Sequence, residues 1–229
     1  MTQTAPSTAP TKVAPAIGLV VAALAVVYVV WGSTYLGIRI VVEEAPPLTS
    51  MGLRFLTAGV LLGVILSFKG GLRRLRVRPR ELLGAALLGL MLPMLGNGLV
   101  SVGENLGAPS GSTALLIAIA PLIIVLFRAL TGDVPNPLSL LGVLIGFAGL
   151  AYLVLAGSGS GSDLPLVPAL IILFASTCWA FGSFIQPKLV LPEDVFVTTV
   201  YEMVSGGLIM VTVGFLAGER FTGDYSGRT

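Results

Sequence analysis

Seven long apolar stretches run through this chain, and each is long enough to cross a lipid bilayer. An α-helix rises about 1.5 Å per residue, so about 20 apolar residues match the thickness of the hydrocarbon core. The stretches are residues 16–40, 48–68, 82–102, 109–130, 138–156, 166–187 and 195–217. They predict an all-α polytopic membrane protein with seven transmembrane helices in one bundle.

The composition indicates the same class. Apolar residues make up 55% of the 229 residues and charged residues only 10%. A water-soluble domain of this size needs a more charged surface, whereas lipid solvates the outer faces of a helix bundle. We therefore expect no separate soluble domain.

Basic residues are concentrated in one loop. Six Lys or Arg residues fall between Lys69 and Arg80, and only Glu81 offsets them. Because short cytoplasmic loops accumulate Lys and Arg, this loop is expected inside, and the N-terminus with it since two spans precede the loop. A nucleic-acid partner is not expected, because membrane topology already explains the charge.

Turn-forming residues divide the chain into parts. We expect a disordered tail over residues 1–15, five spans over 16–156, a Gly/Ser linker over 157–163, two spans over 164–217 and a polar tail over 218–229. Runs of Gly and Ser are flexible, which makes the linker the clearest internal boundary.

The two groups of spans share a sequence pattern. A shift of 148 residues places Trp31 on Trp179 and Arg54 on Glu202 without a gap. A unit of five spans is odd, so its second copy enters the membrane the other way up. This inverted-repeat architecture is typical of secondary transporters, whose substrate site lies between the halves near mid-membrane.

Short motifs occur in a characteristic order along the chain. They are Trp31-Gly32-Ser33-Thr34-Tyr35-Leu36-Gly37-Ile38-Arg39, Pro46-Pro47, Leu53-Arg54-Phe55, Asn97-Gly98, Gly103-Glu104, Pro109-Ser110-Gly111, Ala120-Pro121-Leu122, Gly146-Phe147-Ala148-Gly149 and Cys178-Trp179-Ala180-Phe181-Gly182-Ser183. Over about residues 17–217, their order and spacing resemble EamA-type transporters of the drug/metabolite transporter superfamily. The last motif resembles the opening of that family's second EamA repeat.

The resemblance implies ten helices in two inverted five-helix halves, in a bacterial inner membrane, with both termini in the cytoplasm. It implies export or exchange of small metabolites, such as amino acids, without ATP. The second repeat of this chain stops after two helices, which departs from the family pattern. We therefore expect a truncated or partial product; an odd-span variant completed by a partner chain is the alternative.

Two charged residues lie within spans. Arg54 lies about 9 Å below the outer surface, where it either binds a substrate carboxylate or serves as a structural anchor. Glu202 lies at the equivalent depth from the opposite face, where it either couples transport to protons, pairs with a basic residue or faces water. The two depths leave about 12 Å between these residues, so no direct ion pair is expected.

Aromatic and hydroxyl side chains can line a substrate cavity. Trp31, Tyr35 and Trp179 offer flat surfaces for aromatic or cationic substrates, although tryptophan also anchors spans at the bilayer surface. Ser33 can bond to substrate or, as is usual, to its own helix backbone.

Polar residues in the third span and two glycine motifs have several interpretations. Asn97 can bond to a carbonyl freed by Pro93, to another helix or to a ligand, and a bond between helices is favoured. Glu104, at the outer end of that span, is expected near water. Gly59–Gly63 and Gly142–Gly146 are each Gly-x-x-x-Gly, which favours packing inside the bundle and leaves a homodimer open.

The chain lacks residues that several other functions need. It contains no histidine, which argues against intramembrane metalloproteases and Ser–His hydrolases. It has no Walker motif, and its one cysteine, Cys178, cannot form an intrachain disulfide. We expect no enzyme activity, no cofactor and no metal.

These patterns predict an alternating-access carrier of small organic metabolites embedded in the lipid bilayer, with proton coupling as one option. The expected substrate-binding residues are Trp31, Ser33, Tyr35, Arg54, Asn97, Trp179 and Glu202. The alternative is a truncated, non-transporting remnant or membrane scaffold.

Overall fold

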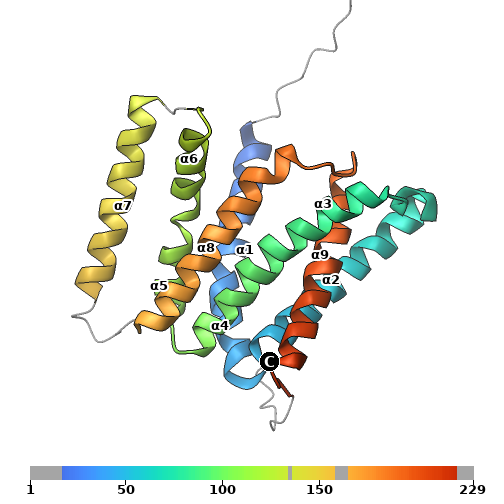
Figure 1. The fold of residues 1–229 in the computed structure, drawn as a ribbon, viewed down its shortest axis with the longest axis horizontal. Coiled ribbons are helices and arrows are strands. Elements are labelled where there is room, and N and C mark those ends of the chain that lie inside the picture. The colour runs from blue at the N-terminus through green and yellow to red at the C-terminus, as the bar shows by residue number, and fades with distance from the viewer. Residues whose placement is uncertain (1–16, 134–135, 158–164, 221–229) are drawn as a thin grey trace, which may run out of the picture. The chain divides into compact units, whose positions relative to one another are not determined.

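The computed structural model describes residues 17–133, 136–157 and 165–220, and all regular elements in these ranges are helices (Figure 1). In chain order they are α1 (Ile17–Glu44), α2 (Pro47–Gly70), η1 (Leu72–Leu75), α3 (Pro79–Gly89), η2 (Leu90–Gly98), α4 (Leu99–Asn105), α5 (Ser110–Ile117), α6 (Ala120–Leu130), α7 (Pro137–Gly157), α8 (Leu166–Ile185), η3 (Gln186–Lys188) and α9 (Val195–Leu216). The predicted tail 1–15, most of the linker 157–163 and most of the tail 218–229 lie outside the described residues.

The chain divides into two compact units, Met1–Thr34 and Tyr35–Thr229. The described part of the first unit is the N-terminal part of α1. The second unit begins within α1 and contains all the other helices, which carry the packing described below.

The polytopic helical class is confirmed. Six helical stretches among the described residues are long and apolar enough to cross a membrane: Ile17–Glu44, Pro47–Gly70, Pro79–Asn105, Ser110–Leu130, Leu166–Lys188 and Val195–Leu216. They correspond to all the predicted spans except the fifth. The fifth is α7, whose described apolar stretch, Pro137–Gly149, is shorter than a full span.

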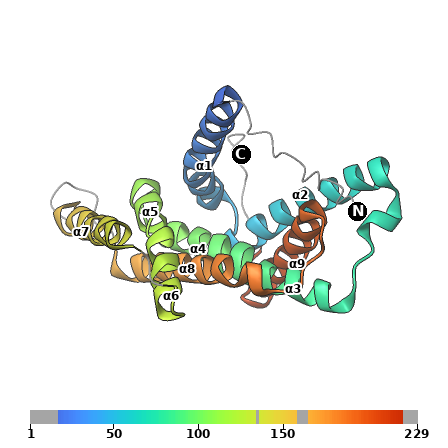
Figure 2. The same ribbon diagram turned by 90° about the horizontal axis from the view of Figure 1, so that it is seen from above.

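Helices α2 and α9 form the closest pair, and Figures 1 and 2 show them side by side. They run antiparallel, because Gly52 faces Val211 while Gly63 faces Val200. A Cβ atom on Gly207 would lie 2.8 Å from the carbonyl oxygen of Gly52, so only glycine allows the two backbones to approach this closely. Gly59 also faces α9, so the Gly59–Gly63 motif packs inside the bundle.

The same pair is fastened at one end by a carboxylate. Glu219, just after α9, accepts hydrogen bonds from the backbone N–H groups of Leu48 (3.1 Å) and Thr49 (2.8 Å) and from the Thr49 hydroxyl (2.7 Å). The first N–H groups of a helix have no partner within it, and their partial positive charge favours an anion there. Glu219 therefore caps α2 from a point distant in the sequence.

At the other end of the pair, the basic loop packs against α9. Tyr201 donates a hydrogen bond from its hydroxyl to the Leu75 carbonyl oxygen at 2.5 Å. Leu75 packs against an apolar cluster that includes Leu66 and Val200. The loop is therefore anchored to the helix pair by apolar contacts and by a hydrogen bond.

Two consecutive spans are irregular. The third span changes from α-helix to π-helix over η2, which contains Pro93 and returns to α-helix as α4. The fourth span breaks at Ala118 and Ile119, between α5 and α6. Proline cannot donate a backbone hydrogen bond, and π-helical segments occur frequently at functional sites.

Candidate functional site

Helix α8 packs against both irregular spans. It contacts η2 and α4 of the third span and α5 and α6 of the fourth (Figures 1 and 2). Ser176 donates a hydrogen bond to the Ile117 carbonyl oxygen, next to the break between α5 and α6, at 3.4 Å. Trp179 lies three residues further on, on the neighbouring turn of α8, and reaches the π-helix.

The Trp179 ring lies directly against the backbone of η2. A Cβ atom on Gly96 would lie only 2.7 Å from Cε3 of the ring, so a side chain at this position would displace the indole. Gly96 is buried and Trp179 is half-buried. The absence of a side chain at Gly96 therefore makes the indole position possible.

Asn97 follows Gly96 and is half-buried. Its amide Nδ2 donates to the Leu92 carbonyl oxygen at 3.4 Å, within its own helix. The sequence favours a bond to another helix, but the structure places this bond within the irregular span. At 3.4 Å this hydrogen bond is long. Its donor, Asn97, is the residue next to Gly96, against which the Trp179 ring lies.

Glu202 lies on α9, which packs against the beginning of the third span. Its backbone carbonyl accepts the Ser205 hydroxyl at 3.2 Å. One turn further on, Gly206 lies against Pro93, because a Cβ atom there would be 2.6 Å from the Pro93 Cβ atom. The Glu202 carboxylate is half-buried, and among the described residues it has no hydrogen bond or ion pair.

Arg54 lies away from this cluster. It is exposed on α2, where its guanidinium contacts Met51 Sδ at 3.7 Å and lies 5.6 Å from the centroid of the Phe55 ring. Gly59 faces Met203 and Val204 in the antiparallel pair, so Arg54 and Glu202 are separated by about 10 Å along the helix axis. No ion pair between these two residues is present, as the sequence depths predicted.

The three predicted residues of α1 have different positions. Ser33 donates its hydroxyl to the Val30 carbonyl oxygen at 3.0 Å, the usual bond to its own helix. Trp31 and Ser33 precede the boundary after Thr34 and so belong to the first unit. Tyr35 begins the second unit and packs against the apolar cluster that contains Met94 of η2.

Four of the seven predicted residues lie within the irregular third span or pack on helices beside it, whereas Arg54, on a helix that also contacts this span, is exposed. The four are Tyr35, Asn97, Trp179 and Glu202. Sequence reasoning missed Ser176 and the Gly96 contact. Pro93 and the Ala120-Pro121 pair were the available signals, because proline in a span marks an interrupted helix.

Glu104 differs from its expected environment. The sequence placed it near water, but the structure buries its side chain completely, at 0% exposure. Arg39 donates to the Glu104 backbone carbonyl at 2.8 Å and to the Glu43 carboxylate at 2.9 Å. The helices around the C-terminal end of α4 cover a residue that its sequence position alone would place in solvent.

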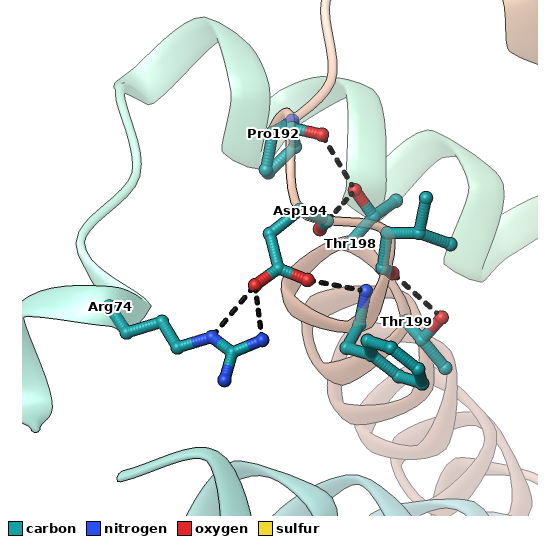
Figure 3. A network of polar contacts seen from close by, with 7 residues as sticks. Arg74, Pro192, Asp194, Thr198 and Thr199 are labelled. Atoms are coloured by element: carbon teal, nitrogen blue, oxygen red, sulfur yellow. Dashed lines mark hydrogen bonds and ion pairs between the residues drawn. The ribbon is translucent and has the colours of Figure 1, made fainter. Parts of the chain in front are cut away.

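A second polar site lies at the start of α9. Arg74 of η1 forms an ion pair with Asp194 at 2.6 Å, and Figure 3 shows the guanidinium reaching that carboxylate. Asp194 also caps α9 by accepting the Phe196 N–H at 3.0 Å. The hydrogen bond from Arg74 lowers the pKa of Asp194 below its usual value. A pocket of about 450 Å³ opens beside this pair, lined by Arg74, Arg76, Val77, Arg78, Glu81, Pro192, Glu193, Asp194 and Val197.

Comparison with known proteins identifies the family. The EamA-like transporter family matches residues 16–155, which is more than half of the chain. The chain belongs to the EamA-like transporter family. The match begins near the start of α1 and ends within α7, so it includes both irregular spans.

Several curated relatives are similar over most of the chain. The uncharacterized inner membrane transporter YedA of Escherichia coli K12 is 40% identical over 201 residues, which are 87% of this chain and 63% of YedA. The uncharacterized transporter YvbV of Bacillus subtilis is 25% identical over 84% of this chain and 61% of its own length. The chain thus spans less than two thirds of these relatives. No solved structure matches it.

Proposed function

We propose that this protein transports small organic metabolites, such as amino acids, across the bacterial inner membrane by export or exchange. Membership of the EamA-like family and similarity to a relative named an inner membrane transporter support this proposal. The basic loop and the N-terminus face the cytoplasm in this proposal, following the distribution of Lys and Arg.

The observation that carries the proposal is the position of α8 between two interrupted spans. Ser176 lies at the break in the fourth span, and Trp179 lies on the π-helix of the third. Interrupted helices leave backbone groups without regular partners, and transporters use such groups to bind substrate near mid-membrane. An indole beside them adds a flat surface for an organic solute.

The remaining residues extend this site. In the proposed cycle the two repeats rock about a central cavity, which Tyr35, Asn97 and Trp179 of the second unit line. Arg54 and Glu202 are the proposed charge partners of the substrate. Glu202 also couples transport to protons in this scheme, because a carboxylate within a span is costly to keep charged.

Efflux from proteoliposomes tests the site. The purified chain is reconstituted into vesicles of E. coli lipid loaded with a mixture of ¹⁴C-labelled amino acids. Trp179→Ala is expected to lower efflux at least tenfold. Phe174→Ala is the matched control, because Phe174 is an aromatic residue of the same helix whose side chain is exposed.

Two results would contradict the proposal. Normal efflux by Trp179→Ala would reject the role of α8. A folded and correctly inserted wild-type chain that moves none of the labelled solutes would reject amino-acid transport by this chain and favour the scaffold alternative. Size-exclusion chromatography in detergent verifies that each variant is folded.

A further inference from the structure

Glu104 is the only acidic or basic residue of the described chain whose side chain is fully buried. Both of its carboxylate oxygens are inaccessible, and neither has a hydrogen-bond partner among the described residues. An ionised carboxylate removed from water without donors is strongly disfavoured, whereas a neutral carboxyl is much less so. The charge state of Glu104 therefore depends on the donors within its reach.

The polar groups beside Glu104 are already engaged. Thr113 is completely buried and donates its hydroxyl to the Pro109 carbonyl oxygen at 3.1 Å. Arg39 directs one nitrogen to the Glu104 backbone carbonyl and another to the Glu43 carboxylate. The positive charge of Arg39 is thus compensated by Glu43, while the Glu104 carboxyl oxygens receive no donor.

The helices packed against α4 supply few other ionisable groups. Neither η2 nor α5 contains one. The other neighbours are α2, α8 and the part of α1 in the second unit, together with Glu219, which caps α2. Their charged or titratable residues are Tyr35, Arg39, Glu43, Glu44, Arg54, Lys69, Cys178 and Glu219. Of these, Arg39 is bonded to Glu104, and it is bonded to the backbone carbonyl.

A protonated carboxyl fits this environment better than a carboxylate. A carboxylic acid has an O–H that can donate, and a hydroxyl oxygen that already donates can still accept. The Thr113 hydroxyl lies within hydrogen-bonding range of the Glu104 side chain, and its oxygen is such an acceptor. We propose that Glu104 is a proton-binding site, holding a proton in this closed arrangement and releasing it when the C-terminal end of α4 opens to water.

The chain around Glu104 provides a route for this release. The residue lies one position before the end of α4 and is followed by the exposed Leu106 and by Gly107, which has φ of +102°. When the bond between Arg39 and the Glu104 carbonyl opens, water reaches the carboxyl. The O–H bond then breaks, the proton passes to water, and the carboxylate left behind can accept a hydrogen bond from Arg39.

Infrared spectroscopy tests the proton site without requiring transport. The wild-type chain in lipid nanodiscs is expected to show the C=O stretch of a protonated carboxyl at pH 7, where glutamate in water is ionised. Glu104→Gln should remove this band component. Glu43→Gln should leave it, because Glu43 is exposed and binds the same arginine. Glu202→Gln identifies any contribution from the other carboxyl inside a span.

The possible results separate this proposal from the transport proposal. Absence of a protonated-carboxyl band in wild type, or a band unchanged in Glu104→Gln, would overturn the proton site. If Glu104→Gln does not fold, Thr113→Val is used instead; it removes the acceptor and should shift the frequency of the band, and an unshifted band counts against the site. The band can be present in a chain that shows no efflux, in which case only the transport proposal fails.

Discussion

Most hydroxyl side chains within the spans of this EamA-like chain bond to their own helix. Ser33, Thr177 and Thr212 each donate to a carbonyl three or four residues earlier. Such bonds satisfy the hydroxyl locally and need no partner helix. Ser101, Ser176 and Tyr201 differ, since each reaches a carbonyl of another segment, and such bonds fix one helix relative to another.

The Arg74–Asp194 pair gives a pH prediction at the same scale. Because the pKa of Asp194 is lowered in the folded protein, its stabilising contribution is complete above the unfolded value of about 3.9 and is lost as pH falls through the folded pKa. Wild type should therefore lose thermal stability more steeply than Asp194→Asn below about pH 4. Asparagine keeps the helix cap and removes only the charge.

Thermal unfolding in detergent between about pH 5 and pH 2 measures this difference. Glu193→Gln is the control, because Glu193 lines the same pocket and forms no ion pair with Arg74. Parallel pH profiles for wild type and Asp194→Asn would show that the pair does not stabilise the fold.

At the scale of elements, glycine contacts determine which helices pair. The α2–α9 contact places the second helix of one predicted repeat against the second helix of the other. The two glycines of the motif in α7 differ. A Cβ atom on Gly146 would lie 3.0 Å from the Leu122 side chain of α6, whereas a Cβ atom on Gly142 would have no neighbour within 4 Å. The same sequence motif thus supports close packing at one position and none at another.

Matched glycine substitutions test this contact. Gly207→Val should lower the free energy of unfolding by about 1–3 kcal/mol, because its side chain would meet the backbone of α2. Gly142→Val introduces the same side chain into open space and should change stability by less than about 0.5 kcal/mol. Reversible unfolding in mixed SDS micelles measures both values, and equal losses would reject the close α2–α9 contact.

At the scale of the whole molecule, charge sets the proposed orientation. The loop that carries six basic residues packs on the same end of α2 and α9 as Asp194, while Glu219 caps the opposite end of α2. The ends of this helix pair therefore differ in charge. Cytoplasmic placement of the basic end follows from the positive-inside rule.

Reporter fusions test that orientation. Green fluorescent protein becomes fluorescent in the cytoplasm, whereas alkaline phosphatase becomes active in the periplasm. After residue 75, a fusion to green fluorescent protein should therefore fluoresce and a fusion to alkaline phosphatase should be inactive. Fusions after residue 45 should give the opposite pattern. Active phosphatase after residue 75 would place the basic loop outside and reject the proposed topology.

The sequence alone determined that this is a helical membrane protein of the EamA type, because span length and apolar composition are local properties of the chain. It also marked Pro93 and Asn97 as unusual positions in the third span. The environments of Trp179 and Glu104 were decided only by the tertiary structure. Gly96 accommodates the indole, and the covering of Glu104 requires α1 and α5 to meet α4, contacts between distant segments that no local pattern encodes.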